Sequence, residues 1–93
     1  MKVTTDKGKT IPIDWMYPQR SVTERLMIGL HDSRPLTEIA ADFAGCEHLH
    51  RESAEEGDAD FDGYTEPVTL SRPSFGVDND NVLVVLSRPV KED

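Results

Sequence analysis

The sequence contains one cysteine and little positive charge, and each shortage excludes a class of protein. The single cysteine, Cys46, cannot form an internal disulfide, so we expect a reducing compartment. Ten lysines and arginines stand against eighteen aspartates and glutamates, which gives a net charge of −8. Binding to DNA or RNA backbones needs clustered basic residues, so we expect no nucleic-acid partner.

Long hydrophobic runs are also missing. No apolar stretch approaches the ~20 residues of a membrane-spanning helix, and residues 1–6 lack the apolar region of a signal peptide. We therefore expect no membrane partner and a cytoplasmic location, or a virion location if the protein derives from a phage. The length predicts a single domain over residues 1–93, with a frayed tail over 89–93.

Short apolar segments with a two-residue period predict β-strands. The predicted strands cover residues 2–5, 10–17, 25–31, 64–72 and 82–86, with a weaker strand over 46–51. In the second segment Ile11, Ile13, Trp15 and Tyr17 alternate, so we expect them to share one face and Trp15 and Tyr17 to lie in the core. The last segment is apolar on both faces, which is typical of a central, fully covered strand.

A three-to-four-residue period predicts a helix over about residues 35–44. Its apolar stripe consists of Leu36, Ile39, Ala40 and Phe43. We expect Asp32 or Ser33 to cap its start and Gly45 to end it. The fold class is therefore α+β and mostly β: five to six strands in a bent sheet or small barrel, with one short helix packed on it.

Acidic residues concentrate between residues 47 and 66. This segment holds eight acids and one base, which accounts for −7 of the net charge of −8. One interpretation is a solvated acidic loop over 53–63 that keeps the protein soluble. The other is that the cluster attracts a cation or a basic partner surface.

Residues 58–63 carry the D-x-D-x-D-G opening of a calcium loop. The candidate calcium ligands are Asp58, Asp60, Asp62 and Glu66. Thr69 stands at the twelfth position, where a calcium loop needs a bidentate carboxylate, so the likeness to an EF-hand covers only the first half of the loop. The alternative is a chance match within an acid-rich turn.

Other residues offer weaker chemistry. Possible zinc ligands are Cys46, His48 and His50, which alternate, together with His31; their spacing differs from that of structural zinc sites. A nucleophile with a base and an orienting group could be formed by Cys46, His48 or His31, and Asp32, but the flanking sequence does not support it, and no glycine-rich phosphate loop is present. We therefore expect neither an enzyme nor a cofactor, and an enzyme that uses Cys46 and His48 is the third hypothesis. Phe61 and Tyr64, set among acids, are candidates for an exposed contact with a partner.

Two segments resemble small proteins of gut-bacterial genomes and their prophages that are encoded near phage structural genes. They are residues 26–45, with the pattern D-x-R-P-L-x-E-I-A followed by a helix and a glycine, and residues 62–66. The resemblance implies a non-enzymatic virion or assembly component and assigns no catalytic residue. We therefore expect a protein that acts by contact with a protein partner or by self-association. The alternative is a calcium-binding module that uses the loop at 58–63.

Overall fold

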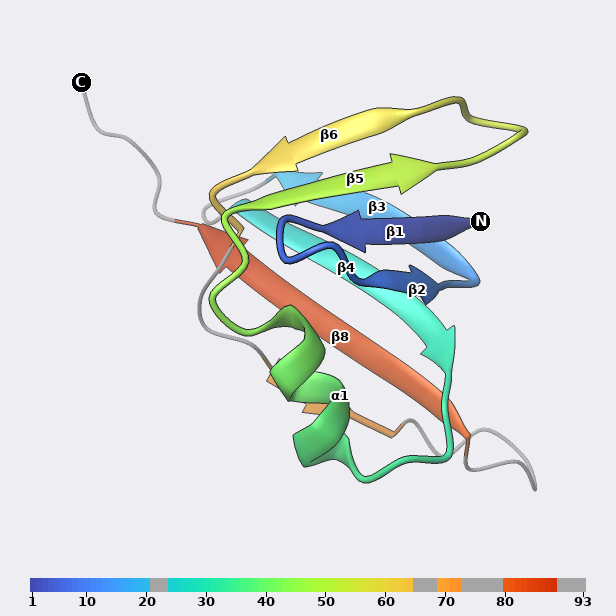
Figure 1. The fold of residues 1–93 in the computed structure, drawn as a ribbon, viewed down its shortest axis with the longest axis vertical. Coiled ribbons are helices and arrows are strands. Elements are labelled where there is room, and N and C mark those ends of the chain that lie inside the picture. Colours follow the sequence, from blue (N-terminus) through green and yellow to red (C-terminus); the bar gives the residue numbers. More distant parts are fainter. Residues whose placement is uncertain (21–23, 65–68, 73–79, 89–93) are drawn as a thin grey trace.

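The computed structural model describes residues 1–20, 24–64, 69–72 and 80–88, and these contain one helix and eight strands (Figure 1). The elements are β1 (Lys2–Thr5), β2 (Thr10–Pro12), β3 (Trp15–Arg20), β4 (Glu24–His31), α1 (Leu36–Phe43), β5 (His48–Glu52), β6 (Ala59–Asp62), β7 (Thr69–Ser71) and β8 (Asn81–Arg88). None of the helical segments in the described ranges is long and apolar enough to cross a membrane.

The strands form two antiparallel sheets. Sheet 1 has the order β2-β1-β5-β6, and sheet 2 has the order β3-β4-β8-β7. The α+β, mostly β class is confirmed, but the prediction of five to six strands in one bent sheet or small barrel is wrong. The physical reason is that the predicted strand over 10–17 divides into β2 and β3, which pair in different sheets.

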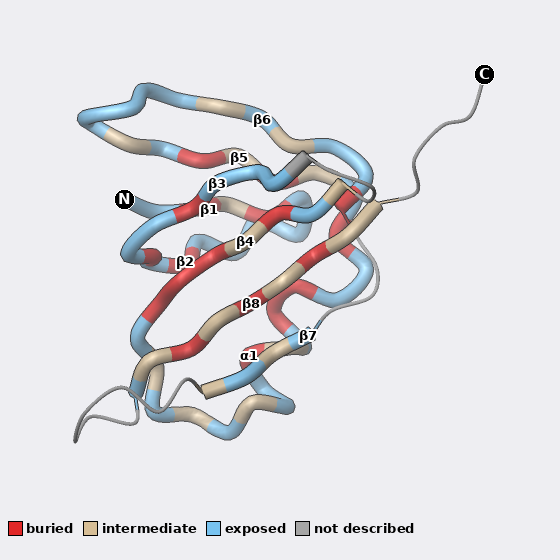
Figure 2. The backbone as a smooth tube through the Cα atoms, turned by 180° about the vertical axis from the view of Figure 1, so that it is seen from behind, coloured by how far each residue is buried: buried red, intermediate tan, exposed pale blue. Residues whose placement is uncertain are grey.

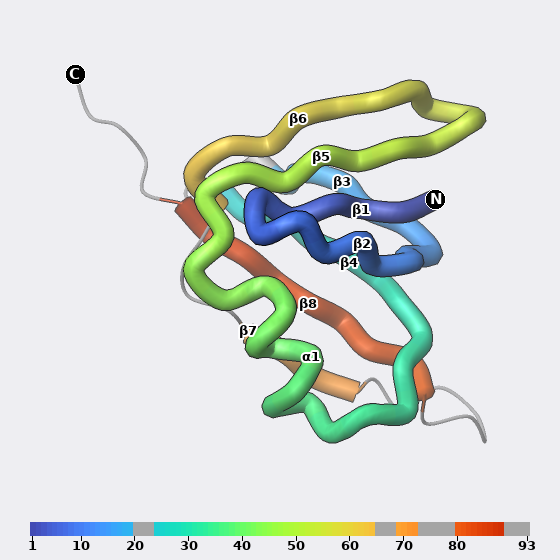
Figure 3. The backbone as a smooth tube through the Cα atoms, viewed as in Figure 1, coloured from blue at the N-terminus to red at the C-terminus, as the bar shows by residue number. Residues whose placement is uncertain are grey.

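The core lies between the layers. Sheet 1 and α1 lie next to each other and cover the same face of sheet 2 (Figures 1 and 3). The largest fully buried side chains come from both sheets, the helix and the segment after it: Phe43, Leu26, Ile28, Ile39, Leu49, Leu86, Val3, Val84 and Cys46. The other face of sheet 2 is turned away from these layers, as the view from behind shows (Figure 2).

The helix lies where its stripe predicts. It runs from Leu36 to Phe43, and Gly45 takes a positive φ of 70° just after it, which confirms the predicted end. The predicted side-chain cap is wrong, because no side chain in the described part of the chain caps α1. The carboxylate of Asp32 accepts hydrogen bonds from the backbone and side chain of Arg34 instead.

The chain crosses from sheet 1 to sheet 2 at Ile13 and Asp14. The backbone N–H of Ile13 donates to Met1 O at 3.0 Å, next to β1, whereas the N–H of Asp14 donates to Gly29 O in β4 at 2.7 Å. Two successive residues are thus held by different sheets. A strict two-residue alternation cannot continue through such a junction.

The crossing reverses the faces of β3. Ile11 and Ile13 are buried as predicted, but the next core residue is Met16, which is 2% exposed. Trp15 and Tyr17 are 38% and 50% exposed, so the prediction that they lie in the core is wrong. They lie on the outer face of sheet 2.

The prediction of one acidic loop over residues 53–63 is wrong for its second half, which is mostly a strand. Residues 59–62 form β6, which pairs with β5, so only residues 53–58 connect the two strands. The predicted strand over 64–72 is represented by β7, and residues 65–68 lie outside the described residues, as does the predicted tail over 89–93.

We expect the contact between α1 and the sheets to determine stability. Phe43 is 0% exposed, and replacing it by Ala should lower the free energy of unfolding by about 3–5 kcal/mol. The measurement is urea unfolding of Phe43→Ala beside Glu38→Ala, an exposed position on the same helix whose change should stay within about 0.5 kcal/mol. A loss below about 1 kcal/mol for Phe43→Ala would contradict the described packing.

Candidate functional site

The outer face of sheet 2 carries apolar side chains in two rows that cross the strands. Strand register places Trp15, Gly29 and Leu83 in one row. The neighbouring row holds Tyr17, Met27 and Val85. We call these six residues the apolar face. Met27, Leu83 and Val85 are half-buried and the two aromatic side chains are exposed, so this face presents large apolar surface to solvent.

Gly29 allows the aromatic side chains to lie close to the sheet. A Cβ atom at this position would lie 2.1 Å from two atoms of the Trp15 indole, so any side chain there would displace the ring. The Trp15 and Tyr17 rings are stacked, with centroids 5.3 Å apart and planes inclined by 25°. An isolated glycine in a strand marks such a close approach, and here it supports an aromatic platform.

Polar residues border the apolar face at both ends of the strands. His31 and Asn81 form the next row at one end. Gln19, Arg25 and Ser87 form the row at the other end. An apolar centre with aromatic residues and a polar rim is the composition of a protein–protein interface.

The outward-facing side chains of β8 are less buried than the sequence predicts. Val82, Val84 and Leu86 are buried, but Leu83 and Val85 on the opposite face are only half-buried. β8 is central in sheet 2, as predicted, yet in the described part of the chain no second layer covers its outer face (Figure 2). The prediction of a fully covered strand is therefore wrong.

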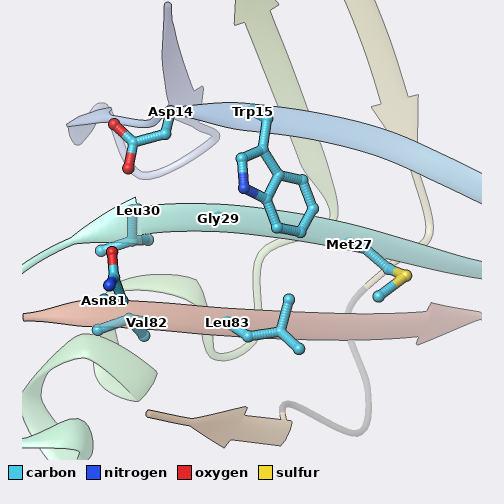
Figure 4. A pocket seen from close by; sticks show the side chains of 8 residues that line it. All are labelled: Asp14, Trp15, Met27, Gly29, Leu30, Asn81, Val82 and Leu83. Atoms are coloured by element: carbon cyan, nitrogen blue, oxygen red, sulfur yellow. The ribbon is translucent and has the colours of Figure 1, made fainter. Parts of the chain in front are cut away.

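A pocket of about 300 Å³ opens beside Trp15 on this face (Figure 4). Asp14 and Asn81 lie at one end of it and Met27 at the other, with Trp15 and Leu83 between them. The remaining lining residues are Gly29, Leu30 and Val82. The pocket thus has a polar end and an apolar end, and among the described residues its lining contains one acid and no base.

The outer face of sheet 1 has the opposite character. Cross-strand pairs join His48 to Asp62 and His50 to Asp60. His48 Nδ1 lies 2.5 Å from Asp62 Oδ1, and His50 Nδ1 lies 2.6 Å from Asp60 Oδ1. Further contacts join His48 Nε2 to Asp60 at 3.3 Å and His50 Nε2 to Asp58 at 3.7 Å. These five residues form a ladder of alternating carboxylates and imidazoles, which we call the His–Asp ladder.

The ladder changes the pKa of its members. The hydrogen bond to Asp62 raises the pKa of His48, and the hydrogen bond to Asp60 raises the pKa of His50. The hydrogen bond from His50 lowers the pKa of Asp60. All of these side chains are solvent-exposed, so water and salt screen the interactions.

The structure places the candidate calcium ligands along an extended segment rather than around a loop. Asp60 and Asp62 belong to β6, with Asp58 just before it, and each carboxylate contacts a histidine. Glu66 lies outside the described residues. Within the described ranges no group of three or more acidic, histidine or cysteine side chains is arranged to hold a metal ion. Calcium binding by these residues stays a prediction that their geometry does not support.

The candidate zinc ligands are also separated. His48 and His50 share the exposed face of β5, as their spacing predicts. Cys46 precedes this strand and is buried, and burial raises the pKa of its thiol. His31 contacts Asp14 at the end of the apolar face, on the other sheet.

Phe61 and Tyr64 pack toward the core, whereas the sequence predicts that they are exposed. Tyr64 is 3% exposed and belongs to the core, and Phe61 is half-buried against it. Phe61 lies opposite the buried Leu49 of β5, so it faces inward while the neighbouring aspartates face outward. The prediction that these two aromatic residues form an exposed partner contact is therefore wrong.

The D-x-R-P-L pattern stabilises the fold. Arg34 Nη2 lies 2.8 Å from Asp32 Oδ2 and 2.7 Å from Asp42 Oδ2, so it ties the start of α1 to its last turn. Burial alone would raise the pKa of Asp42, but hydrogen bonds from Lys9 and Arg34 outweigh it and lower the pKa. Arg72, next to β7, donates to the backbone oxygens of Asp32 and Arg34. These contacts are structural and form no open site.

No family model, curated protein or solved structure matches the chain. The resemblance to prophage proteins therefore stays a prediction, and the geometry of the two outer faces carries the functional argument.

We expect the His–Asp ladder to make stability depend on pH. The pKa values of His48 and His50 are raised in the folded state. Their contribution to the free energy of unfolding is therefore complete below the ordinary pKa of 6.5 and is lost as pH rises through the raised values. The pKa of Asp60 is lowered in the folded state. Its contribution to the free energy of unfolding is therefore present above the ordinary pKa of 3.8 and is lost as pH falls through the lowered value. The ladder therefore stabilises most between these limits.

The measurement is urea unfolding of the unaltered chain and of a His48→Gln/His50→Gln variant at about pH 5.5 and pH 8.5. The unaltered chain should exceed the variant in stability by more at the lower pH. An equal difference at both pH values, or a larger one at the higher pH, would show that the ladder does not act this way.

Proposed function

We propose that the protein is a non-enzymatic protein-binding module and that the apolar face is its contact surface. The observation that supports this most is the exposure of Trp15 and Tyr17, stacked on a sheet whose register adds Met27, Leu83 and Val85 beside them. Burying this much aromatic and aliphatic surface is favourable, and tryptophan and tyrosine are the residues most enriched at interface hot spots.

The net charge indicates what kind of partner fits. A second copy of this chain would also carry −8, and long-range repulsion would oppose its approach. A partner with positive net charge and its own apolar patch would be attracted instead, and the apolar contact would then hold it. The proposed occupant is therefore a different, basic protein. Membership of a phage particle rests on the sequence resemblance alone.

A paired-variant binding experiment tests the proposed function. The immobilised protein captures partners from its native lysate, and the captured protein is purified and titrated against the unaltered chain. Replacing Trp15 and Tyr17 by Ser should weaken this binding by about 30-fold or more, as loss of a hot spot of 2 kcal/mol does. Because Trp15 is the single tryptophan, its fluorescence should shift to the blue when the partner covers it.

The matched control is His48→Ser/His50→Ser, which removes two exposed rings from the outer face of sheet 1. This control variant should bind the partner with an affinity within about twofold of that of the unaltered chain. Salt should weaken partner binding by the unaltered chain and by the control variant alike. Equal binding by the Trp15/Tyr17 variant, or self-association of the unaltered chain in sedimentation velocity through the same residues, would contradict the proposal of a basic partner at this face.

A further inference from the structure

The pocket beside Trp15 has room for one side chain rather than for a cofactor. Its volume of about 300 Å³ is at the lower end of small-ligand sites, which span about 300–1,000 Å³. It also opens on the same face as the proposed interface, between β3, β4 and β8 (Figure 4). A residue from a bound partner could therefore enter it directly.

The lining indicates the chemistry of that residue. Trp15 provides an aromatic surface, and Met27 and Leu83 provide an aliphatic one. Asp14 is the acid of the pocket, and its side chain is 48% exposed although it contacts His31. Since no lysine or arginine among the described residues lines the pocket, a cation that enters meets the Trp15 ring and the Asp14 carboxylate, which it shares with His31.

We propose that this pocket binds an arginine side chain of the partner. Guanidinium groups stack on indole rings and hydrogen-bond to carboxylates, and the aliphatic stem of arginine packs on apolar side chains. In the pocket the head group lies at the end formed by Asp14 and Asn81, against Trp15, and the stem crosses Leu83 toward Met27. This inference rests on the proposed function, and it names the anchor of the basic partner.

Titration of the ¹⁵N-labelled chain with N-acetyl-L-arginine methylamide tests the inference. Trp15 is the single tryptophan, so one indole N–H peak reports directly on the pocket. The matched ligand is N-acetyl-L-citrulline methylamide, which keeps the planar shape but lacks the charge, because a carbonyl oxygen replaces one NH₂ group of the guanidinium. The arginine probe should bind at millimolar concentration, at least about fivefold more tightly than the citrulline probe.

Two chain variants separate local from general electrostatics. Asp14→Asn and Glu55→Gln each remove one negative charge, but only Asp14 lines the pocket, and Glu55 is exposed on the connection between β5 and β6. Asp14→Asn should abolish the preference for arginine over citrulline, and Glu55→Gln should preserve it. Equal binding of the two probes, no shift of the indole peak, or equal effects of the two variants would overturn the inference.

The arginine titration and the partner-binding experiment can fail independently of each other. If the Trp15/Tyr17 variant loses the purified partner but the pocket shows no preference for arginine, the inference fails and the binding face stands. If the variant keeps the partner while the pocket prefers arginine through Asp14, the proposed protein-binding face fails.

Discussion

The crossing of the chain at Ile13 and Asp14 is the constraint on which the two faces of the protein depend. Because these neighbours are hydrogen-bonded to different sheets, β2 and β3 cannot share one alternation. The shift by one residue directs Met16 inward and brings Trp15 to the outer face, opposite Gly29. Without that shift the aromatic pair would face the core, and the outer face of sheet 2 would lack its two aromatic side chains.

The two outer faces differ in the forces that act on them. The His–Asp ladder on sheet 1 balances carboxylates against imidazoles across one strand pair, and it is hydrated and screened. The apolar face on sheet 2 is exposed, so a partner that covered it would gain free energy by removing aromatic and aliphatic surface from water. The acidic charge of residues 47–66 can attract a basic partner from a distance, and Asp14 is the carboxylate that lines the pocket on the apolar face.

Local patterns predicted the parts of the fold that local forces determine. The stripe of α1, its end at Gly45 and the strand at residues 25–31 follow from spacing alone. The division into two sheets depends on pairing between distant segments, so no local pattern contains it. The shared face of His48 and His50 was predictable, whereas the aspartates opposite them depend on the register of β5 and β6. For the site, the isolated Gly29 within a strand was the one available signal.

We propose that a partner binds the outer face of sheet 2 and not that of sheet 1. The most direct measurement is photo-crosslinking with p-benzoylphenylalanine in place of Tyr17, compared with the same group in place of Thr10, which is exposed in β2. We expect a covalent adduct with the basic partner from position 17 and none from position 10. An adduct from position 10 alone would contradict it.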